Sequence, residues 1–249
     1  GEILLPNEIT PQLAEICGIH AGDGYLRNDG EHVELDISGH INEDRLYYDE
    51  HVAPLFGNVF GIKLSPREFP ARRTYGFVSG KRMIVKYFHE FLGFPYGAKT
   101  YTVMAPQVVI QSRDREVYAG FLRGLFDTDG CLNFRRTYGT YKNVTFKRTH
   151  HTYPRIMFST VSKSLAIDVI KMLDFLGIKY RSYVVAPSKE NEATKFRIQA
   201  CGKKTLEKWM EKIGFKNPNQ ITRYEVWKKL GFCPPNTTLD ERIQMLKGA

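Results

Sequence analysis

The sequence predicts an α+β fold in which one αββαββα unit occurs twice. Three observations support this prediction. Residues 13–26 align without gaps with residues 119–132, two shorter motifs recur later in the same order, and apolar residues in each copy follow helical and then strand spacing. The first alignment contains these identical pairs: Gly18 with Gly124, Asp23 with Asp129, Gly24 with Gly130, and Leu26 with Leu132.

The later matches set the limits of the two copies. Residues 60–63 (Phe-Gly-Ile-Lys) match residues 176–179 (Leu-Gly-Ile-Lys), and residues 92–94 (Leu-Gly-Phe) match residues 213–215 (Ile-Gly-Phe). The spacing between the copies grows along the chain, so we expect a unit of roughly 105 to 115 residues whose second copy has gained a segment around residues 137–153. We therefore divide the chain into an N-terminal half, residues 1–115, and a C-terminal half, residues 116–249.

Each copy is predicted to run helix, two strands, helix, two strands, helix. After the first helix, the strand at residues 32–38 alternates cleanly, so Val33, Leu35 and Ile37 face one side and the polar residues between them face the other. Such a strand has one buried face and one face that is free to bind a partner.

The later elements follow from helical spacing and helix-ending glycines. Residues 42–60 and 162–176 are predicted as the second helices, and residues 80–92 and 203–213 as the third. Gly93 and Gly214 follow the third helices where a C-terminal cap is expected. The second strand pair of the N-terminal half, around residues 63–79, is basic and aromatic.

Composition favours a folded protein with a polyanionic partner. The chain has 249 residues, is 42% hydrophobic and carries a formal net charge of +9. No Asp or Glu occurs in residues 131–167 or 69–89, although both stretches contain several Lys and Arg residues. One such stretch could be a solvated face, but two of them interleaved with tyrosines favour nucleic acid.

The sequence contains no sign of a membrane segment or of export. No apolar run approaches the roughly 18 residues of a membrane helix, and the first residues lack the pattern of a signal peptide. The expected location is intracellular, in the cytoplasm of a prokaryote or in an organelle. The four cysteines are widely spaced and are expected to be reduced: Cys17, Cys131, Cys201 and Cys233.

Small residues recur at every fourth position of both motif helices, and each helix ends in Asp-Gly. The small residues are Ala14, Gly18 and Gly22 in the first copy and Gly120, Gly124 and Thr128 in the second. Residues of this size let two helix backbones approach closely, and two helices paired about a pseudo-twofold axis would bring Asp23 and Asp129 together. A helix packed on its own sheet explains one stripe equally well, and Asp-Gly alone is a common turn signal. The presence of both features in each repeat favours the paired arrangement.

Two neighbouring carboxylates repel each other unless a cation lies between them, and a divalent metal ion is the usual solution. Bound Mg²⁺ can lower the pKa of an attacking water and neutralise the leaving oxygen in a displacement at phosphorus. Phosphodiester hydrolysis is therefore the reaction that fits both the paired acids and the basic charge.

Residues 16–24 (Ile-Cys-Gly-Ile-His-Ala-Gly-Asp-Gly) and 122–130 (Leu-Arg-Gly-Leu-Phe-Asp-Thr-Asp-Gly) resemble the two motifs of monomeric LAGLIDADG homing endonucleases. The second is close to the consensus, whereas the first has Ala21 at the family's first Asp, which is not the metal ligand there. The resemblance spans about residues 10–235. It implies the LAGLIDADG homing endonuclease fold, with pseudo-twofold units whose two antiparallel sheets form a saddle over DNA. The implied activity is site-specific cleavage of double-stranded DNA in intron or intein homing.

The resemblance also implies the site residues. Asp23 and Asp129 would hold the catalytic metal ions, and the backbone carbonyls of Gly22 and Thr128 would complete the sites. The expected cofactor is Mg²⁺ or Mn²⁺, with Ca²⁺ as a substitute that does not support cleavage.

The family also places a lysine near the scissile phosphates in each half, after the third helix. Lys99 fits that place in the first copy. In the second copy Lys216 lies nearby, although an ungapped count puts Gln220 opposite Lys99. Each lysine could instead be an ordinary surface residue.

A sheet from each half would present alternate side chains to the major groove of the duplex. In the N-terminal half the candidates are Arg27, Asn28, His32, Glu34, Asp36, Ser38, Arg67, Arg72, Arg73 and Tyr75. In the C-terminal half they are Asn133, Arg135, Arg136, Tyr138, Lys142, Lys147, Arg148, Arg155, Arg181, Lys195 and Arg197. Some would contact only phosphates. Because the two sets differ, we expect a monomer that binds a long, non-palindromic site.

Three alternatives remain at this point. His150 and His151 could suggest a metal site, but that segment holds no further ligand, so we expect an exposed pair in a DNA-facing loop. The chain could be an RNA maturase or an intein-embedded member of the family, although its last residues lack the His-Asn pair of an intein, which argues against splicing. It could also be a non-catalytic DNA-binding regulator, but the retention of both Asp23 and Asp129 argues against this.

Overall fold

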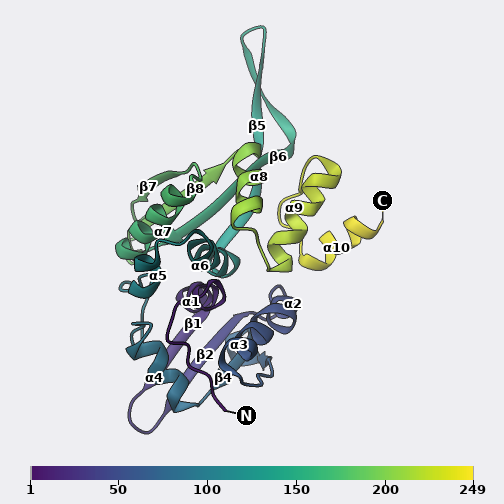
Figure 1. The fold of residues 1–249 in the computed structure, drawn as a ribbon. Helices are drawn as coiled ribbons and strands as arrows, with labels where there is room; N and C mark the ends of the chain where they lie inside the picture. The colour runs from purple at the N-terminus through teal and green to yellow at the C-terminus, as the bar shows by residue number, and fades with distance from the viewer. Residues whose placement is uncertain (1, 249) are drawn as a thin grey trace.

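The chain folds into two similar halves, each built on one four-stranded antiparallel sheet (Figure 1). The computed structural model describes residues 2–248, apart from the side chains of residues 140, 141 and 146. The strand order is β1-β2-β4-β3 in the first sheet and β5-β6-β8-β7 in the second, so both sheets have the same topology. This arrangement confirms the predicted duplicated α+β fold.

The N-terminal half follows the predicted order of helix, two strands, helix, two strands, helix. Its elements are α1 (Pro11–Asp23), β1 (Gly24–Asn28), β2 (Val33–His40), α2 (Arg45–Tyr47), η1 (Tyr48–Val52), α3 (Ala53–Phe60), β3 (Arg67–Phe69), η2 (Pro70–Arg72), β4 (Thr74–Ser79) and α4 (Arg82–Glu90).

The C-terminal half repeats this order and adds helices outside the repeat. Helix α5 (Gln107–Ser112) precedes it, and its elements are α6 (Arg115–Thr128), β5 (Gly130–Tyr141), β6 (Val144–Thr160), α7 (Lys163–Leu176), β7 (Arg181–Val185), β8 (Lys195–Cys201), α8 (Lys203–Lys212), α9 (Pro218–Leu230) and α10 (Leu239–Lys247).

Helices α1 and α6 lie side by side at the centre of the molecule (Figure 1). Each begins at a capping side chain: Thr10 Oγ1 accepts from Leu13 N at 3.1 Å, and Asp114 Oδ1 accepts from Glu116 N at 2.8 Å. All of residues 13–21 in α1 are buried, because one side of the helix packs on its own half and the other on α6.

The glycine stripes let α1 and α6 touch through their backbones. A Cβ added at Gly18 would lie 2.1 Å from Phe121 O, and one added at Gly124 would lie 2.2 Å from Glu15 O. Gly18 and Gly124 are equivalent positions of the repeat, so the helices run parallel and their C-terminal ends arrive together. The paired arrangement predicted from the small residues is present.

The core lies between each sheet and its helices. In the N-terminal half Leu26, Leu35, Ile37 and Phe77 are buried on the helix-facing side of the sheet. In the C-terminal half Leu132, Phe134, Ile156, Phe158 and Ile198 are their counterparts. The opposite faces of both sheets carry polar side chains, as the alternation in residues 32–38 predicts.

The predicted helix at residues 42–60 is divided into three segments. Between α2 and α3, the residues of η1 form a π-helical turn. Pro54 stands at the start of α3 and has no N–H to donate to the preceding turn, which accounts for the wider turn there.

The extra segment of the second copy forms a hairpin arm. Strands β5 and β6 extend beyond their sheet and pair as far as Tyr141 with Val144 (Figure 1). Lys142 and Asn143 turn the chain with φ values of 46° and 66°. The register shifts near Arg136, where the arm leaves the sheet.

Helices α9 and α10 tie the C-terminal half to the N-terminal half. The fully buried Arg242 donates to Thr222 Oγ1 at 3.0 Å and to Asn219 Oδ1 at 2.6 Å, and it lies 3.8 Å from Glu43. Glu43 also accepts from Leu239 N at 3.0 Å. These contacts brace α10 against the segment that precedes α2.

All four cysteines are free, as expected. Within residues 2–248, none of the helices has the length and apolar character needed to cross a membrane.

Candidate functional site

The close packing of α1 and α6 makes Asp23 and Asp129 neighbours at the centre of the molecule. A Cβ added at Gly22 would lie 2.1 Å from Thr128 Oγ1 and 3.3 Å from Asp129 Cγ. Only glycine at position 22 lets the end of α6 come so close to the end of α1. The small residues along α1 and α6 therefore position Asp23 and Asp129 as well as the two helices.

Asp23 is surrounded by other acids. Its Oδ2 accepts a hydrogen bond from Tyr48 Oη at 2.8 Å. A Cβ added at Gly39 would lie 3.0 Å from this same oxygen and 2.7 Å from Asp44 Oδ2, so two carboxylates converge on a glycine in β2. Burial raises the pKa of Asp23 well above its ordinary value, and repulsion from Asp129 and Asp44 raises it further.

Asp129 has the same kind of environment. Burial raises its pKa, and only the nearby Lys99 opposes this effect. A close group of carboxylates, with Asp23 half-buried, Asp129 open to solvent and little compensating positive charge, is the setting in which a divalent cation is stabilised. The oxygen donors at this point, the two carboxylates with the carbonyl groups at the helix ends, are those that Mg²⁺ and Mn²⁺ prefer.

Lys99 reaches this site from the loop that follows α4. Its Nζ donates to Gly22 O at 3.2 Å. Burial lowers the pKa of Lys99, while Asp129 and Asp23 act in the opposite direction. Lys99, Gly22 and Asp129 line a cavity of about 380 Å³ that also reaches Arg197 and Lys195 of the C-terminal sheet. The structure thus places Lys99 close to Asp23 and Asp129.

The C-terminal half places different groups at the equivalent position. Gln220, opposite Lys99 in the repeat, is buried, and its side chain accepts from Leu132 N at 2.9 Å and donates to Gly130 O at 3.1 Å. Lys216 contributes its backbone N–H to Asp127 at 2.8 Å while its side chain is exposed. The two halves therefore differ at the positions predicted for the catalytic lysines: Lys99 lies at the paired acids, whereas Gln220 is buried and the side chain of Lys216 is exposed.

Sequence reasoning missed three residues of this site: Tyr48, Asp44 and Asn217. Asn217 Nδ2 donates to Asp44 Oδ1 at 2.8 Å and to Asp127 O at 3.0 Å, so it connects the halves. Asn217 also caps α9 through Asn219 N at 2.9 Å, and that capping role is a signal the sequence contains. The sequence contains no comparable signal for Tyr48 or Asp44, which are distant from both motifs.

The open face of the N-terminal sheet carries most of the predicted side chains. Strand register places Arg27, Glu34, Asp36, Ser38 and Arg67 on this face. His32, Arg72 and Arg73 lie in the adjoining turns. Tyr25, which was not among the predicted residues, shares this face and is 43% exposed.

Three predictions for this sheet need correction. Tyr75 lies on the helix-facing side with Phe77, is 7% exposed, and donates to Asp49 Oδ1 at 2.7 Å. Asn28 shares the side of Leu26 and donates to Tyr96 Oη at 3.4 Å. Asp36 is on the open face but is 3% exposed because Arg72 and Ser38 bind its carboxylate. Basic and aromatic composition selected the right segment here, but only the strand register decides which side each residue faces.

The open face of the C-terminal sheet is formed by residues from all four strands. Six predicted residues share this face: Asn133, Arg135, Arg155, Arg181, Lys195 and Arg197. Gln199 and Tyr183 also belong to it and are joined by a hydrogen bond of 2.7 Å. Neither was predicted, because the residues predicted on β7 and β8 are all charged, whereas Gln199 and Tyr183 share their strand spacing but are neutral.

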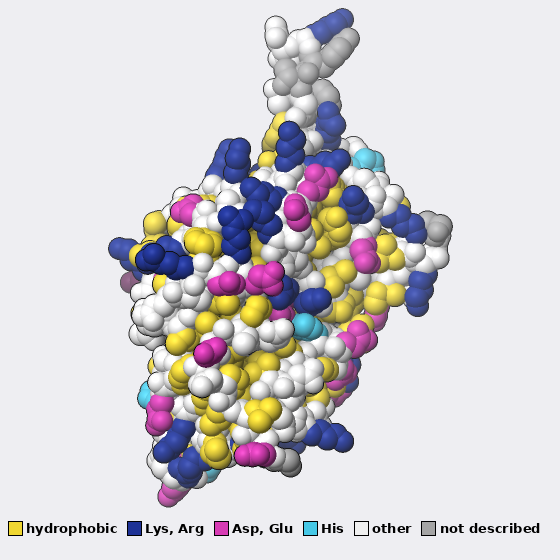
Figure 2. All heavy atoms as spheres, in the orientation of Figure 1, with side chains coloured by type: hydrophobic (Ala, Val, Ile, Leu, Met, Phe, Trp, Pro, Cys, Tyr) yellow, Lys and Arg dark blue, Asp and Glu magenta, His cyan; other side chains and the backbone are white. Residues whose placement is uncertain are grey.

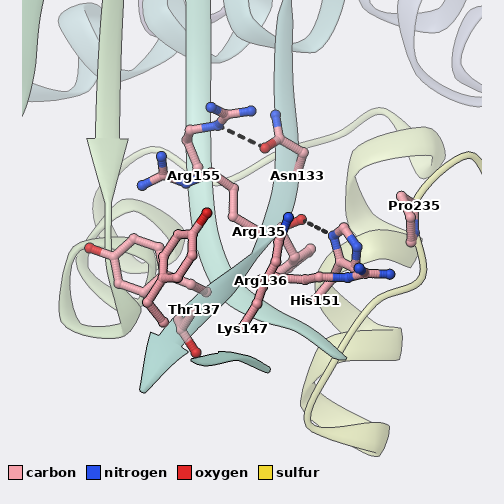
Figure 3. Close-up of a pocket in the computed structure, with 11 residues that line it drawn as sticks. Asn133, Arg135, Arg136, Thr137, Lys147, His151, Arg155 and Pro235 are labelled. Carbon is pink, nitrogen blue, oxygen red and sulfur yellow. Dashed lines mark hydrogen bonds between the residues drawn. The ribbon is translucent and has the colours of Figure 1, made fainter. Parts of the chain in front are cut away.

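The remaining candidates of the C-terminal half lie on the arm: Arg136, Tyr138, Lys142, Lys147 and Arg148. Figure 2 shows Lys and Arg side chains along the arm and around its base. An open cleft of about 850 Å³ at this base is lined by Arg135, Arg136, Lys147 and Arg155 on one side and by Pro235 on the other (Figure 3).

His150 and His151 do not lie in a loop, contrary to expectation. Both belong to β6, where the rings of His150 and Phe232 are tilted by 34° with their centres 4.7 Å apart, and His151 Nδ1 lies 2.8 Å from Phe134 O. No group of three or more His, Cys, Asp or Glu side chains suited to a metal ion is found within residues 2–248. The acid pair would therefore need carbonyl or water oxygens to complete its coordination.

A family model and a curated protein match parts of this chain. Residues 116–214 match the family model described as a LAGLIDADG-like domain. The chain is 29% identical over 203 residues to the replicative DNA helicase DnaB of Rhodothermus marinus, a match that covers 73% of this chain and 20% of the helicase. This chain therefore spans about a fifth of the length of that relative.

A solved structure of the homing endonuclease I-WcaI bound to its DNA recognition sequence is also similar. It shares 16% identity, covers 84% of this chain and 83% of the other, and gives a TM-score of 0.41. That likeness is too weak to assign a role to any residue. The family match places a LAGLIDADG-like domain in residues 116–214, and the N-terminal half has a similar motif and the same strand order.

Proposed function

We propose that this chain is a homing endonuclease: a metal-dependent enzyme that cuts double-stranded DNA at a long, non-palindromic site. The observation that carries the proposal is the meeting of Asp23 and Asp129 at the ends of two parallel helices, with Lys99 beside them. The polar open faces of the two sheets extend this site on either side. Residues 1–115 and 116–249 would each bind one half-site.

In this proposal Asp23 and Asp129 hold Mg²⁺ or Mn²⁺, and the carbonyl groups of Gly22 and Thr128 complete the coordination. The bound metal supplies an activated water and neutralises charge on the leaving oxygen. Lys99 donates to Gly22 O in the structure, so its ammonium group lies where it can also stabilise negative charge on a phosphate. Ca²⁺ would occupy the site and support binding without cleavage.

One copy of the chain contains both acids, so a monomer suffices for the reaction. The hairpin arm belongs to the C-terminal sheet, so the surfaces that the two halves offer to DNA differ, which favours a target that is not a palindrome. The helicase match extends over too small a part of that protein to transfer its activity to this chain.

The proposal is tested by Mg²⁺-dependent cleavage of a cognate duplex, such as the sequence that spans an empty insertion site. Asp23→Asn and Asp129→Asn should each abolish cleavage while DNA binding is retained, because the open faces of the sheets remain intact. Binding without cleavage by the wild-type chain would instead indicate a DNA-binding regulator. Binding to intron RNA in preference to DNA would indicate a maturase.

A further inference from the structure

Two arginines on the open face of the C-terminal sheet are held in place by neutral neighbours. Arg155 Nε donates to Asn133 Oδ1 at 2.9 Å (Figure 3). Arg197 Nε donates to Ser159 Oγ at 3.0 Å. Within residues 2–248, no hydrogen bond engages the terminal amino groups of either guanidinium. Each side chain therefore presents a fixed pair of donors, and such a pair matches O6 and N7 of guanine in the major groove.

The charges of these two arginines are not balanced by acids. Burial and the neighbouring positive charge of Arg135 lower the pKa of Arg155. Arg197 lies 6.0 Å from the ring centre of Tyr183 and likewise has no carboxylate partner within residues 2–248. The ion pair found on this sheet, between Lys195 and Glu192 at 3.2 Å, lies at the end of β8.

The N-terminal sheet is different in this respect. Arg27 forms an ion pair with Asp29 at 2.6 Å, and Arg72 forms one with Asp36. An arginine already paired with a carboxylate must break that pair before it can bind a base, and its charge is already neutralised. Arg67 of the N-terminal sheet has no ion pair within residues 2–248, but it packs on the Phe69 ring at 4.9 Å and no hydrogen bond fixes its guanidinium. Among the described residues of the two open faces, guanidinium groups that are both held through Nε by a neutral side chain and free of an acid therefore occur on the C-terminal sheet.

The register of the strands sets the distance between the two arginines. Arg197 pairs with Ser159 of β6, and Arg155 lies four residues before Ser159 on the same strand. At about 3.4 Å per strand residue, this separation is roughly 14 Å. A strand that follows the major groove would span about four base pairs over that length, since successive base pairs are about 3.4 Å apart.

We propose that Arg155 and Arg197 recognise two guanines, about four base pairs apart, in the half-site that faces the C-terminal sheet. This inference rests on the proposed DNA-binding function and adds its sequence preference. Asn133 and Ser159 act as positioning residues, because each fixes the plane of one guanidinium through its Nε.

The test begins with selection of duplexes from a randomised pool by the wild-type chain, followed by competition with every single base-pair change of the selected site. The wild-type profile should contain two guanines about four base pairs apart in one half-site. Arg155→Gln should remove the preference at one of them, and Arg197→Gln at the other. Each loss should be between about 5-fold and 150-fold, the range for one bidentate contact.

Two further variants make the test specific. Asn133→Ala frees Arg155 Nε and should weaken the same guanine preference as Arg155→Gln, but by less. Lys203→Gln removes one positive charge that Glu207 already faces on α8, and it should leave the whole profile unchanged. Circular dichroism checks that all variants are folded.

The outcomes separate this inference from the proposed function. Equal weakening at every base pair in Arg155→Gln or Arg197→Gln would mean contact with phosphates only and would overturn the inference. A profile without the paired guanines would overturn it as well. Failure to select any duplex would overturn both proposals, whereas selection without cleavage would affect the endonuclease proposal alone.

Discussion

Adding one methyl group at Gly18 tests the geometry on which the proposed site depends. In Gly18→Ala the new Cβ would lie 2.1 Å from Phe121 O and 2.7 Å from Leu125 N. Both atoms belong to the backbone of α6, so they cannot move aside by changing a rotamer. Normal contact begins at about 3.4 Å, so α1 and α6 must separate by roughly 1.3 Å.

Two effects of opposite sign determine the magnitude. Alanine within a helix is favoured over glycine by about 1 kcal/mol. Overpacking a buried contact costs about 1 to 3 kcal/mol, and more when the obstacle is backbone on a helix that is itself packed on both sides. The clash should prevail, and we expect the free energy of unfolding to fall by about 2 to 4 kcal/mol.

Urea unfolding followed by circular dichroism measures this change, with Gly80→Ala as the matched control. A Cβ at Gly80 would have Val33 O as its nearest neighbour at 3.5 Å, an ordinary contact, so this variant should remain within about 0.5 kcal/mol of wild type. Cleavage by folded Gly18→Ala should also fall, because separation of the helices moves Asp23 away from Asp129. Equal unfolding midpoints for the two variants would refute the close helix contact.

Three further predictions concern the charged groups at the centre. Burial raises the pKa of Glu15, but hydrogen bonds with His51 and Arg123 outweigh burial and hold this pKa below its ordinary value. The ionised Glu15 therefore stabilises the fold above about pH 4.3, and this stabilisation is lost as the pH falls below that value. Glu15→Gln should therefore lower the free energy of unfolding at pH 7 by about 3 to 5 kcal/mol, because Arg123 loses its buried carboxylate partner. An unchanged midpoint of urea unfolding would contradict this expectation. Because burial and Asp129 raise the pKa of Asp23, the metal-free protein should lose stability as pH rises above about 4. Bound Mg²⁺ should therefore raise the melting temperature more at pH 8 than at pH 5. This difference between the two pH values should disappear in Asp23→Asn. Lys99→Met should slow single-turnover cleavage about 10²-fold or more. Lys216→Met, which changes an exposed residue, should slow cleavage by less than about 10-fold. Similar cleavage rates for the two variants would argue against a special role of Lys99.

The repeat and its central pair of helices could be predicted from sequence because they depend on local spacing. A period of four small residues specifies a helix face, and an Asp-Gly after that face specifies where the helix ends. Gly18 and Gly124 therefore indicated close contact, and Asp23 and Asp129 followed from the same register. The alternation in residues 32–38 likewise gave the buried side of β2 correctly.

Composition was a weaker guide than alternation in the strands. Tyr75 was selected because its segment is basic and aromatic, yet it occupies the same side of β4 as the core residue Phe77. Gln199 and Tyr183 were overlooked because they are uncharged, although they face the same way as Arg197 and Arg181. A shift of one residue along a strand reverses the side it faces, so a list based on residue type cannot replace the register.

The sequence by itself determined the duplication, the paired acids and the excess of positive charge in the C-terminal half. Only the tertiary structure decided which charges are neutralised. Arg72 meets Asp36, whereas Arg155 meets Asn133, and Asp44 approaches Asp23 over Gly39. The physical reason is that helix and strand periods extend over a few neighbouring residues, while the partner of a charge is set by the packing of segments far apart in the chain.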